Sequence, residues 1–466
     1  MARGAQLWLG RFDALGRSSV FDSQVRIGSV AADGGAWTLQ APLLAERRNT
    51  VWLDGSTLSA QRWGRLDLAT RGEVLLQGAL SLADGGTLAL TGSRVGIEGQ
   101  VRIVGGTVTA SNLLTDSTGS VGMVTPALRG ALTLGAGAVL ELSGRWSNTG
   151  REGAADGAAA WIHGGRVTLE SSHDVTLAAD SQIRVDAGGN VDVKGKAKGG
   201  KGGDISLLAD SSQVSSDGSG RLRLDGRLSG LGVTGAGTLQ LGTGGGVVLA
   251  DTRGNDARVW LSPTLLRSGF ARYDINGHAG LDVADGTQVE VLAAGLRLSD
   301  GARTAVTAGE GLEYWMAPLY TAYPVTGRVA QRGGASLLLR SQRNALGGDV
   351  RIGQGAAVSV DPGQSITLRG GGNITVEGRL TARGGSILLD DVRAARDTYA
   401  ASGSTTQYRL GSNAVLDASG DSNLWRWMHR AGARARCVRV AASASAARWT
   451  GKPPTTWKTA RRMRSW

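Results

Sequence analysis

The chain has 466 residues, of which 41% are apolar and 74 are glycine. This length suffices for two or three ordinary domains or for one elongated solenoid. Residues 1–423 contain no cysteine, which excludes disulfides and cysteine-ligated zinc or iron–sulfur sites there. No apolar run is long enough to span a bilayer, and the start MARGAQLWLG shows no secretory signal. The sequence therefore predicts either a cytosolic protein or one whose native start lies elsewhere.

The net charge of +12 belongs almost entirely to the last residues, 424–466. This tail contains nine arginines, two lysines and no acid, which leaves 40 basic against 39 acidic residues in the rest of the chain. Five of the 13 tryptophans and the one cysteine, Cys437, are in the tail too. Residues 1–423 are thus nearly neutral, and we expect them to bind no specific nucleic acid.

Short bursts of alternating polar and apolar residues fill the first part of the chain. Up to about residue 70 they include QVRIGSV, TVWLDGSTLSA and GRLDLAT, which predict half-buried strands. Residues 72–144 continue with strands of about five residues between glycine-rich corners. No stretch has a helical period, so the sequence predicts an all-β fold. The pattern lapses at 145–163, which we interpret as a loop that leaves the main body.

Six hexapeptides share one pattern of two glycines, a free position, and aliphatic residues separated by a spacer. They are GGRVTL, GGNVDV and GGDISL within 164–207, and GGDVRI, GGNITV and GGSILL within 347–389. A further internal similarity relates GAVLELSG (137–144) to NAVLDASG (413–420). Such self-similarity predicts a repeat protein. The candidate structural glycines are Gly164, Gly165, Gly188, Gly189, Gly202, Gly203, Gly347, Gly348, Gly371, Gly372, Gly384 and Gly385.

Glycine pairs before strands suit a coil that turns sharply at its corners. Some corner residues need positive φ or close backbone approach, which glycine accepts at least steric cost. With about 20 residues per coil and about 4.8 Å between stacked strands, we expect a rod on the order of 70 to 90 Å long. We interpret residues 1–423 as this solenoid.

Four loops interrupt the strand pattern: 145–163, 208–220, 307–334 and 391–410. They are either recognition loops or tolerated insertions. The third is rich in aromatic residues and is the candidate contact loop, although its rings could equally pack onto the solenoid wall. Its aromatic residues are Tyr314, Trp315, Tyr320 and Tyr323.

The motifs that resemble chemical sites are weak. GKAKGGKG (195–202) has the start of a phosphate loop, but Gly202 stands where Ser or Thr must hold magnesium and a strand follows instead of a helix. We interpret it as a flexible lysine-rich corner loop. The four histidines lie at no metal-ligand spacing. We predict no cofactor, no metal site and no catalytic residue.

Acidic residues leave a less favoured enzyme alternative open. Some parallel solenoids degrade polysaccharides with carboxylates on adjacent coils, and a pair within roughly 5 to 10 Å in a cleft would favour that reading. Acids next to turns are more often ordinary solvated residues. The acids that could form such a pair are Asp186, Asp192, Asp282, Asp285 and Glu290.

The GGxVxV segments, GAVLELSG, and the stretches 268–291 and 346–389 resemble the filamentous haemagglutinin family of two-partner secretion exoproteins. The resemblance covers most of the chain to about residue 421. It implies a right-handed parallel β-helix, an outer-membrane β-barrel transporter as partner of the full-length protein, and a secreted or cell-surface location. Host-cell glycans or receptors are the implied binding partners.

The chain departs from that family in two places. No counterpart of its N-terminal secretion domain, with the signal sequence and asparagine–proline motif, is present, so we interpret the chain as an internal fragment. After LDASG the sequence turns into a basic Trp/Arg-rich tail, 424–466, where glycine becomes rare and acids and the strand period vanish. We predict that the tail is disordered and arises from an out-of-frame translation; binding of nucleic acid or an anionic membrane is the alternative.

The predicted function is structural and adhesive: attachment of an exoprotein to host cells or neighbouring bacteria. The main alternative is a non-adhesive shaft that displays a toxin or a tip domain, and an enzyme acting on polysaccharides is the less favoured one.

Overall fold

The computed structural model describes residues 5–10, 22–29, 49–113, 131–149, 161–210, 220–323, 328–342, 348–391 and 407–420. The predictions for the tail, 424–466, and for Gly347 lie outside these residues. Within them almost all regular structure is β-strand, and no helix is long and apolar enough to cross a membrane.

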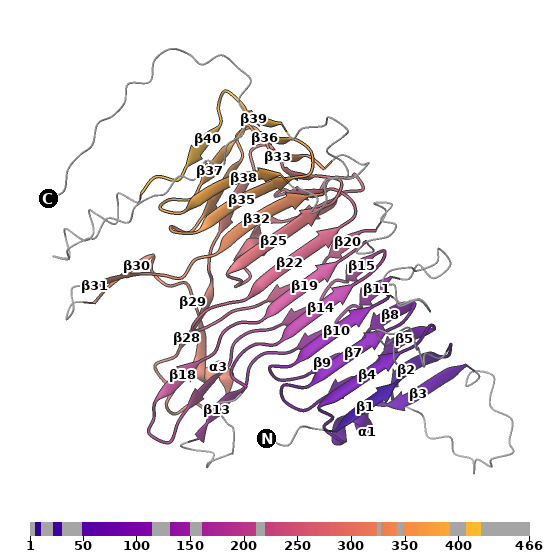
Figure 1. The fold of residues 1–466 in the computed structure, drawn as a ribbon. Coiled ribbons are helices and arrows are strands. Elements are labelled where there is room, and N and C mark those ends of the chain that lie inside the picture. Colours follow the sequence, from indigo (N-terminus) through magenta and orange to yellow (C-terminus); the bar gives the residue numbers. More distant parts are fainter. Residues whose placement is uncertain are drawn as a thin grey trace, which may run out of the picture.

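A parallel sheet of eleven strands, sheet A, runs the length of the described body (Figure 1). Its strands lie in chain order, and each neighbour is the next turn of the chain. They are β1 (Gln6–Leu9), β4 (Arg65–Ala69), β7 (Thr87–Thr91), β10 (Thr107–Ser111), β14 (Arg166–Glu170), β19 (Asp204–Leu208), β22 (Thr238–Thr243), β25 (Arg272–Gly277), β32 (Ser336–Ser341), β35 (Ser365–Gly370) and β38 (Ser386–Asp391).

Two further faces are each built from two consecutive sheets. On the second face, sheet B holds β2 (Gln24–Gly28), β3 (Thr50–Asp54), β5 (Glu73–Leu76), β8 (Arg94–Ile97), β11 (Leu132–Leu134), β15 (Val175–Leu177) and β20 (Leu222–Leu224). Sheet B′ continues it with β23 (Val247–Leu249), β24 (Val259–Leu261), β26 (Leu281–Val283), β33 (Val350–Ile352), β36 (Ile374–Val376) and β39 (Tyr408–Leu410).

The third face is made of short strands. Sheet C holds β6 (Ala79–Ser81), β9 (Gln100–Arg102), β12 (Val139–Glu141), β16 (Gln182–Arg184) and β21 (Arg227–Ser229). Sheet C′ holds β27 (Gln288–Val291), β34 (Ala357–Val360), β37 (Arg379–Thr381) and β40 (Val415–Asp417). All pairings within these five sheets are parallel, which is the arrangement expected of stacked coils.

One regular coil passes through β4, β5 and β6 and returns to sheet A at β7. Arg65 pairs with Thr87, 22 residues on, and Thr87 pairs with Thr107, 20 residues on. The predicted all-β parallel β-helix, with about 20 residues in a regular coil, is confirmed. The predicted right-handed winding is the sense that nearly all crossovers between parallel strands take.

The rod is shorter than the sequence led us to expect. Much of the chain lies in excursions outside the coils. Between the adjacent strands β25 and β32, for example, Arg272 pairs with Ser336, which is 64 residues further along the chain. Eleven strands at about 4.8 Å give sheet A an extent on the order of 50 Å, against the 70 to 90 Å expected. The physical reason is that long excursions lengthen the chain without adding a layer.

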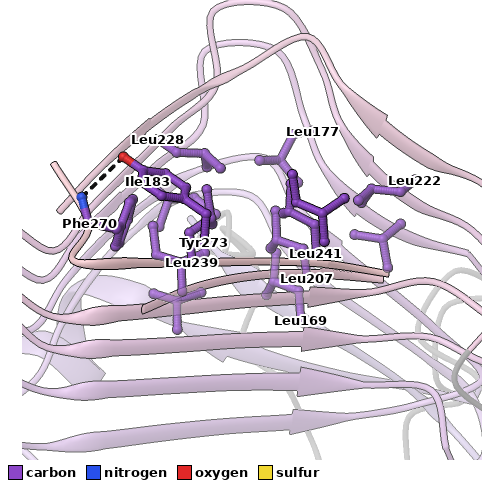
Figure 2. Packing of buried hydrophobic residues seen from close by; sticks show 14 of the residues in the cluster. Leu169, Leu177, Ile183, Leu207, Leu222, Leu228, Leu239, Leu241, Phe270 and Tyr273 are labelled. Atoms are coloured by element: carbon purple, nitrogen blue, oxygen red, sulfur yellow. Dashed lines mark hydrogen bonds between the residues drawn. The ribbon is translucent and has the colours of Figure 1, made fainter. Parts of the chain in front are cut away.

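The core consists of layers of like side chains stacked along the rod. Leu169, Leu207 and Leu241 are paired partners on β14, β19 and β22, and each is buried. They lie one above another in Figure 2. Burying a leucine side chain contributes about 1.5 to 3 kcal/mol, so each repeated layer stabilises the next. In the same core, Tyr273 packs edge-on against Phe270, with ring centroids 6.0 Å apart, and its hydroxyl accepts the Phe270 N–H.

The glycine pairs that open β14 and β19 are required by close backbone approach. A side chain at Gly164 would overlap the carbonyl oxygen of Val185, and one at Gly203 would overlap that of Gly165. Gly384, before β38, instead has a positive φ of 63°. Both reasons anticipated from the sequence therefore occur, at different pairs.

The six hexapeptides do not occupy one equivalent position in the coil. GGRVTL, GGDISL and GGSILL form β14, β19 and β38 in sheet A, whereas GGDVRI and GGNITV form β33 and β36 in sheet B′. GGNVDV forms β17 (Gly189–Val191), outside the coil altogether. Strand-forming pattern and corner glycines recur on every face, so the motif alone cannot tell the faces apart. The echo of GAVLELSG in NAVLDASG does fall on one face, at β12 and β40.

Two local predictions are wrong. The stretch TVWLDGSTLSA is a strand only to Asp54; the helix α1 (Gly55–Ala60) follows, because the Asp54 carboxylate accepts the Thr57 N–H at 2.7 Å and caps it. GKAKGGKG is not a flexible corner loop, since Ala197–Gly199 forms β18, antiparallel to β17.

A candidate binding cleft beside the arm

A lateral arm projects from the solenoid next to sheet C (Figure 1). It consists of the sheet of β13 (Trp146–Asn148), β17 and β18, the hairpin of β28 (Gly295–Leu298) and β29 (Leu312–Trp315), and the short helix α3 (Ala308–Gly311). These elements come from three separate excursions of the chain. Helix α3 packs on β13, and β18 packs on β28. The loop predicted at 145–163 is therefore in part the first strand of the arm.

Trp146 and Asn148 join the three excursions. The Asn148 amide donates to the carbonyl oxygens of Arg303 at 2.9 Å and Ala305 at 3.2 Å. The Trp146 ring lies between Gly189 and Gly311, where any side chain would overlap it. Gly189 is thus required by a neighbouring ring of the arm and not by a coil corner. These contacts fix α3 against β13.

A cleft of about 980 Å³ lies between the arm and the outer face of sheet C. One wall comes from the arm and is mainly apolar, while the floor comes from strands β6, β9, β12 and β16 and is charged. The residues that line it are Ser59, Arg62, Ser81, Leu82, Asp84, Arg102, Val104, Glu141, Ser143, Gly144, Arg145, Trp146, Arg184, Asp186, Ala187, Leu296, Val306, Ala308, Gly309 and Leu312.

The floor is a ladder of paired positions on successive coils. Arg102 of β9 pairs in register with Glu141 of β12, which pairs with Arg184 of β16. The Arg184 guanidinium lies 3.5 Å from the Glu141 carboxylate, whose other oxygen accepts the Ser143 N–H at 3.1 Å. Neighbouring strands in a parallel sheet lie about 4.8 Å apart, so charges of both signs succeed one another closely along the cleft.

Two of the four cleft arginines form ion pairs with cleft acids. Arg145 forms an ion pair with Asp84, and Arg184 pairs with Glu141. Within the part of the chain that the structure describes, the exposed guanidiniums of Arg62 and Arg102 have no hydrogen bond or ion pair. The cleft therefore offers two free cationic donors.

Asp186 is a partly buried carboxyl of the cleft. Burial raises the pKa of this carboxyl above its ordinary value, in opposition to the hydrogen bonds that its Oδ1 accepts from the Ser229 hydroxyl at 2.6 Å and the Leu231 N–H at 2.7 Å. Glu141, on the neighbouring coil, adds like-charge repulsion. The sequence predicts Asp186 as a candidate acid, and the structure brings it beside Glu141, which is not among the predicted candidates.

The remaining acidic candidates take part in structural contacts elsewhere. Asp192 accepts the N–H groups of Lys194 and Lys196 in the β17–β18 turn. Asp282 and Asp285 both pair with Arg351, and their distances to its guanidinium are 3.1 and 2.5 Å. Glu290 pairs with Arg267. None of these four acids lines the cleft.

The aromatic residues of the candidate contact loop lie on the arm and beyond it. Tyr314 of β29 is 62% exposed, and Trp315 stacks under the Arg297 guanidinium, 4.0 Å from the ring centroid. Tyr320 is on β30 (Tyr320–Tyr323), which pairs antiparallel with β31 (Arg328–Gln331). The side chain of Tyr323 lies outside the described residues. The structure does not bring these rings together in the cleft.

The described histidines form no metal site. His163 Nδ1 accepts the Lys201 N–H at 2.9 Å, which ties two excursions together. Burial lowers the pKa of His278. Across the described residues, no group of three His, Cys, Asp or Glu side chains could hold a metal ion.

Sequence reasoning missed Arg62, Arg102, Glu141 and Trp146. Arg62, Arg102 and Glu141 are successively about 40 residues apart, and the four residues meet only through the register of short strands and the fold of the arm. The available signal was the lapse of the strand pattern after residue 144, which marked the start of the arm. Comparisons of this chain with protein-family models, with curated proteins and with solved structures found no match.

Proposed function

We propose that this protein is an adhesive segment of a bacterial surface or secreted exoprotein, and that the arm and its cleft make the contacts. The observation that supports this proposal is the position of the cleft. It lies beside a regular solenoid, whose stacked leucine layers and fully paired strands serve stability. A rigid rod with a shaped cleft on its side suits attachment to a surface better than it suits catalysis.

The proposal includes the relationship and the partners expected from the sequence. The chain would be a fragment of a filamentous-haemagglutinin-like protein, exported by an outer-membrane β-barrel transporter in its full-length form. Its targets would be glycans or receptors on host cells or neighbouring bacteria. The parallel β-helix supports this proposal because that fold is the one the resemblance implies.

Binding of the purified protein to cells tests the proposal. Fluorescently labelled protein is expected to bind epithelial cells or bacteria saturably, and unlabelled protein is expected to compete. A protein with intact β-structure by circular dichroism that binds neither cell type contradicts adhesion and favours the alternative, a shaft that displays a toxin or tip domain.

One observation favours a second candidate, a polysaccharide-degrading enzyme. Asp186, with its raised pKa, and Glu141 lie on neighbouring coils in one cleft, and Glu141 is near enough to Asp186 to raise that pKa. Glycoside hydrolysis uses a protonated and an ionised carboxyl in this way. Release of reducing ends from polysaccharides, lost in both Asp186→Asn and Glu141→Gln, would establish the enzyme; retention of activity in either variant would contradict these roles.

A further inference from the structure

We infer that the cleft binds a linear polysaccharide bearing carboxylate groups, with Arg62 and Arg102 as the residues that contact those groups. This inference rests on the proposed adhesive function and specifies its ligand. The cleft is lined by both charged and apolar groups. From β6 to β16 the floor is about 14 Å long, given about 4.8 Å between strands.

The apolar wall suits the face of a sugar ring. Leu296, Val306 and Leu312 line the arm side, and Val306 is 55% exposed. A sugar ring presents C–H groups on its face and polar groups at its edge, so one side of it can contact this wall while the other contacts the charged floor. An exposed valine at the rim of a cleft gains from such a contact, because burial of apolar surface is favourable.

The two free guanidiniums specify the charge of the ligand. Arg62 follows helix α1, and Arg102 of β9 pairs in register with Ser81 of β6, so both arginines come from the first coils of the cleft. Guanidinium groups bind carboxylates with two parallel hydrogen bonds, which are stronger than bonds between neutral groups. A neutral polysaccharide would leave this donor capacity unused.

The acidic residues of the cleft limit how much negative charge the ligand can carry. Asp84, Glu141 and Asp186 are also in the lining, and Asp84 and Glu141 already pair with the other two arginines. A densely sulfated polymer would be repelled by these groups. A polymer with one carboxylate per sugar can pair with Arg62 and Arg102, and it carries too little negative charge to be strongly repelled by the three acids.

A peptide fits the cleft less well. Strand β9 is paired on both edges, with β6 and with β12, so its backbone offers no edge for strand addition. Strands β12 and β16 are likewise paired on both edges. The edge strand β6 is covered by helix α1, where the Ser81 N–H donates to the Ser59 hydroxyl. Recognition here depends on side chains alone, which is how sugars and not extended peptides are usually held.

Affinity measurements on the full chain test the inference, with polygalacturonate as the carboxylated polymer, dextran as the neutral one and dextran sulfate as the sulfated one. Wild type is expected to bind polygalacturonate, and the double variant Arg62→Gln/Arg102→Gln is expected to bind it roughly ten-fold more weakly, since two charge-assisted contacts are lost. The matched control is Arg223→Gln/Arg409→Gln, which removes two exposed arginines of sheets B and B′ that have no partner among the described residues. It is expected to bind like wild type.

The control also accounts for the basic tail, since every protein compared retains residues 424–466. Equal weakening in both double variants, tighter binding of dextran sulfate than of polygalacturonate at physiological salt, or unchanged binding in the cleft variant would overturn the inference. Cell binding measured in parallel separates the two proposals. If the protein binds cells but does not bind polygalacturonate, only the proposed ligand is refuted. If it binds neither cells nor polygalacturonate, the adhesive function is refuted as well.

Discussion

The solenoid and the arm are built by different physical means. In the solenoid, parallel strands repeat the same leucine and valine layers, so each coil is stabilised by the coils on both sides. In the arm, three excursions meet once, through Trp146 and the Asn148 amide, and the strands are largely antiparallel hairpins. Each coil of the solenoid depends on its neighbours, whereas the arm is held by a few contacts of its own. This difference explains why a binding cleft would form at their junction.

The largest expected effect is on the solenoid core. Leu169→Ala removes a fully buried side chain from a stacked layer and should destabilise the protein by about 2 to 5 kcal/mol. Thr168→Ala, the outward neighbour on the same strand, should change stability by no more than about 0.5 kcal/mol. Chemical denaturation followed by circular dichroism measures both. Similar losses in the two variants would show that the layers do not carry the stability.

A smaller and local effect is expected in the arm. Trp146→Ala removes the ring that lies between Gly189 and Gly311, so α3 should separate from β13. Hydrogen–deuterium exchange should rise in residues 189–199 and 295–315, with the strands of sheet A unchanged. An equal rise throughout sheet A would mean that the arm and the solenoid unfold as one unit.

The next effect concerns the charge of Asp186. The pKa of this carboxyl is raised above 3.8 in the folded protein, so the folded state binds more protons than the unfolded state between the two pKa values. Stability from this group is therefore lost as pH rises through that window and stays lost at neutral pH. Asp186→Asn keeps the acceptor for Ser229 and Leu231 and should be more stable than wild type at pH 7, with no difference at pH values below 3.8. Denaturation at several pH values measures this; a less stable variant at pH 7 would contradict it.

The smallest effect is expected for the ion pairs around Arg351 on the solenoid surface. This guanidinium contacts Asp282, Asp285 and Glu377, but it is partly exposed and therefore screened by water and salt. Arg351→Met should cost about 1 kcal/mol or less, and the cost should shrink as salt is added. A large loss of stability that does not depend on salt would contradict this and would show that these ion pairs contribute to stability as much as the buried core does.

The fold could be predicted because its information is local and repeated. The alternation in GRVTL and DISLL and the glycines before them specify strands and corners, and both segments do form sheet A strands. The assignment of strands to faces could not be predicted, since GGDVRI and GGRVTL read alike but lie in sheets B′ and A. Nothing in the local pattern says how many residues an excursion takes before the next coil.

The cleft could be predicted only in small part. Its position next to a predicted turn makes Asp186 a candidate for an acid pair on adjacent coils, whereas the sequence marks Arg102 and Glu141 only as ordinary outward residues of short strands. Their proximity follows from register, which depends on how many residues separate β10 from β11. The sequence pattern assigns Trp146 only to a loop. Its contacts with Gly189 and Gly311 could not be predicted, because both glycines are distant in the sequence.

Cell binding by Trp146→Ala compared with wild type tests the central claim most directly, namely that function belongs to the arm and cleft and not to the solenoid. The variant is expected to keep the β-sheet circular dichroism and thermal unfolding of the wild-type solenoid while losing most of its saturable binding to cells. Full binding by a variant whose arm exchanges rapidly with solvent would contradict the claim and assign attachment to the solenoid itself.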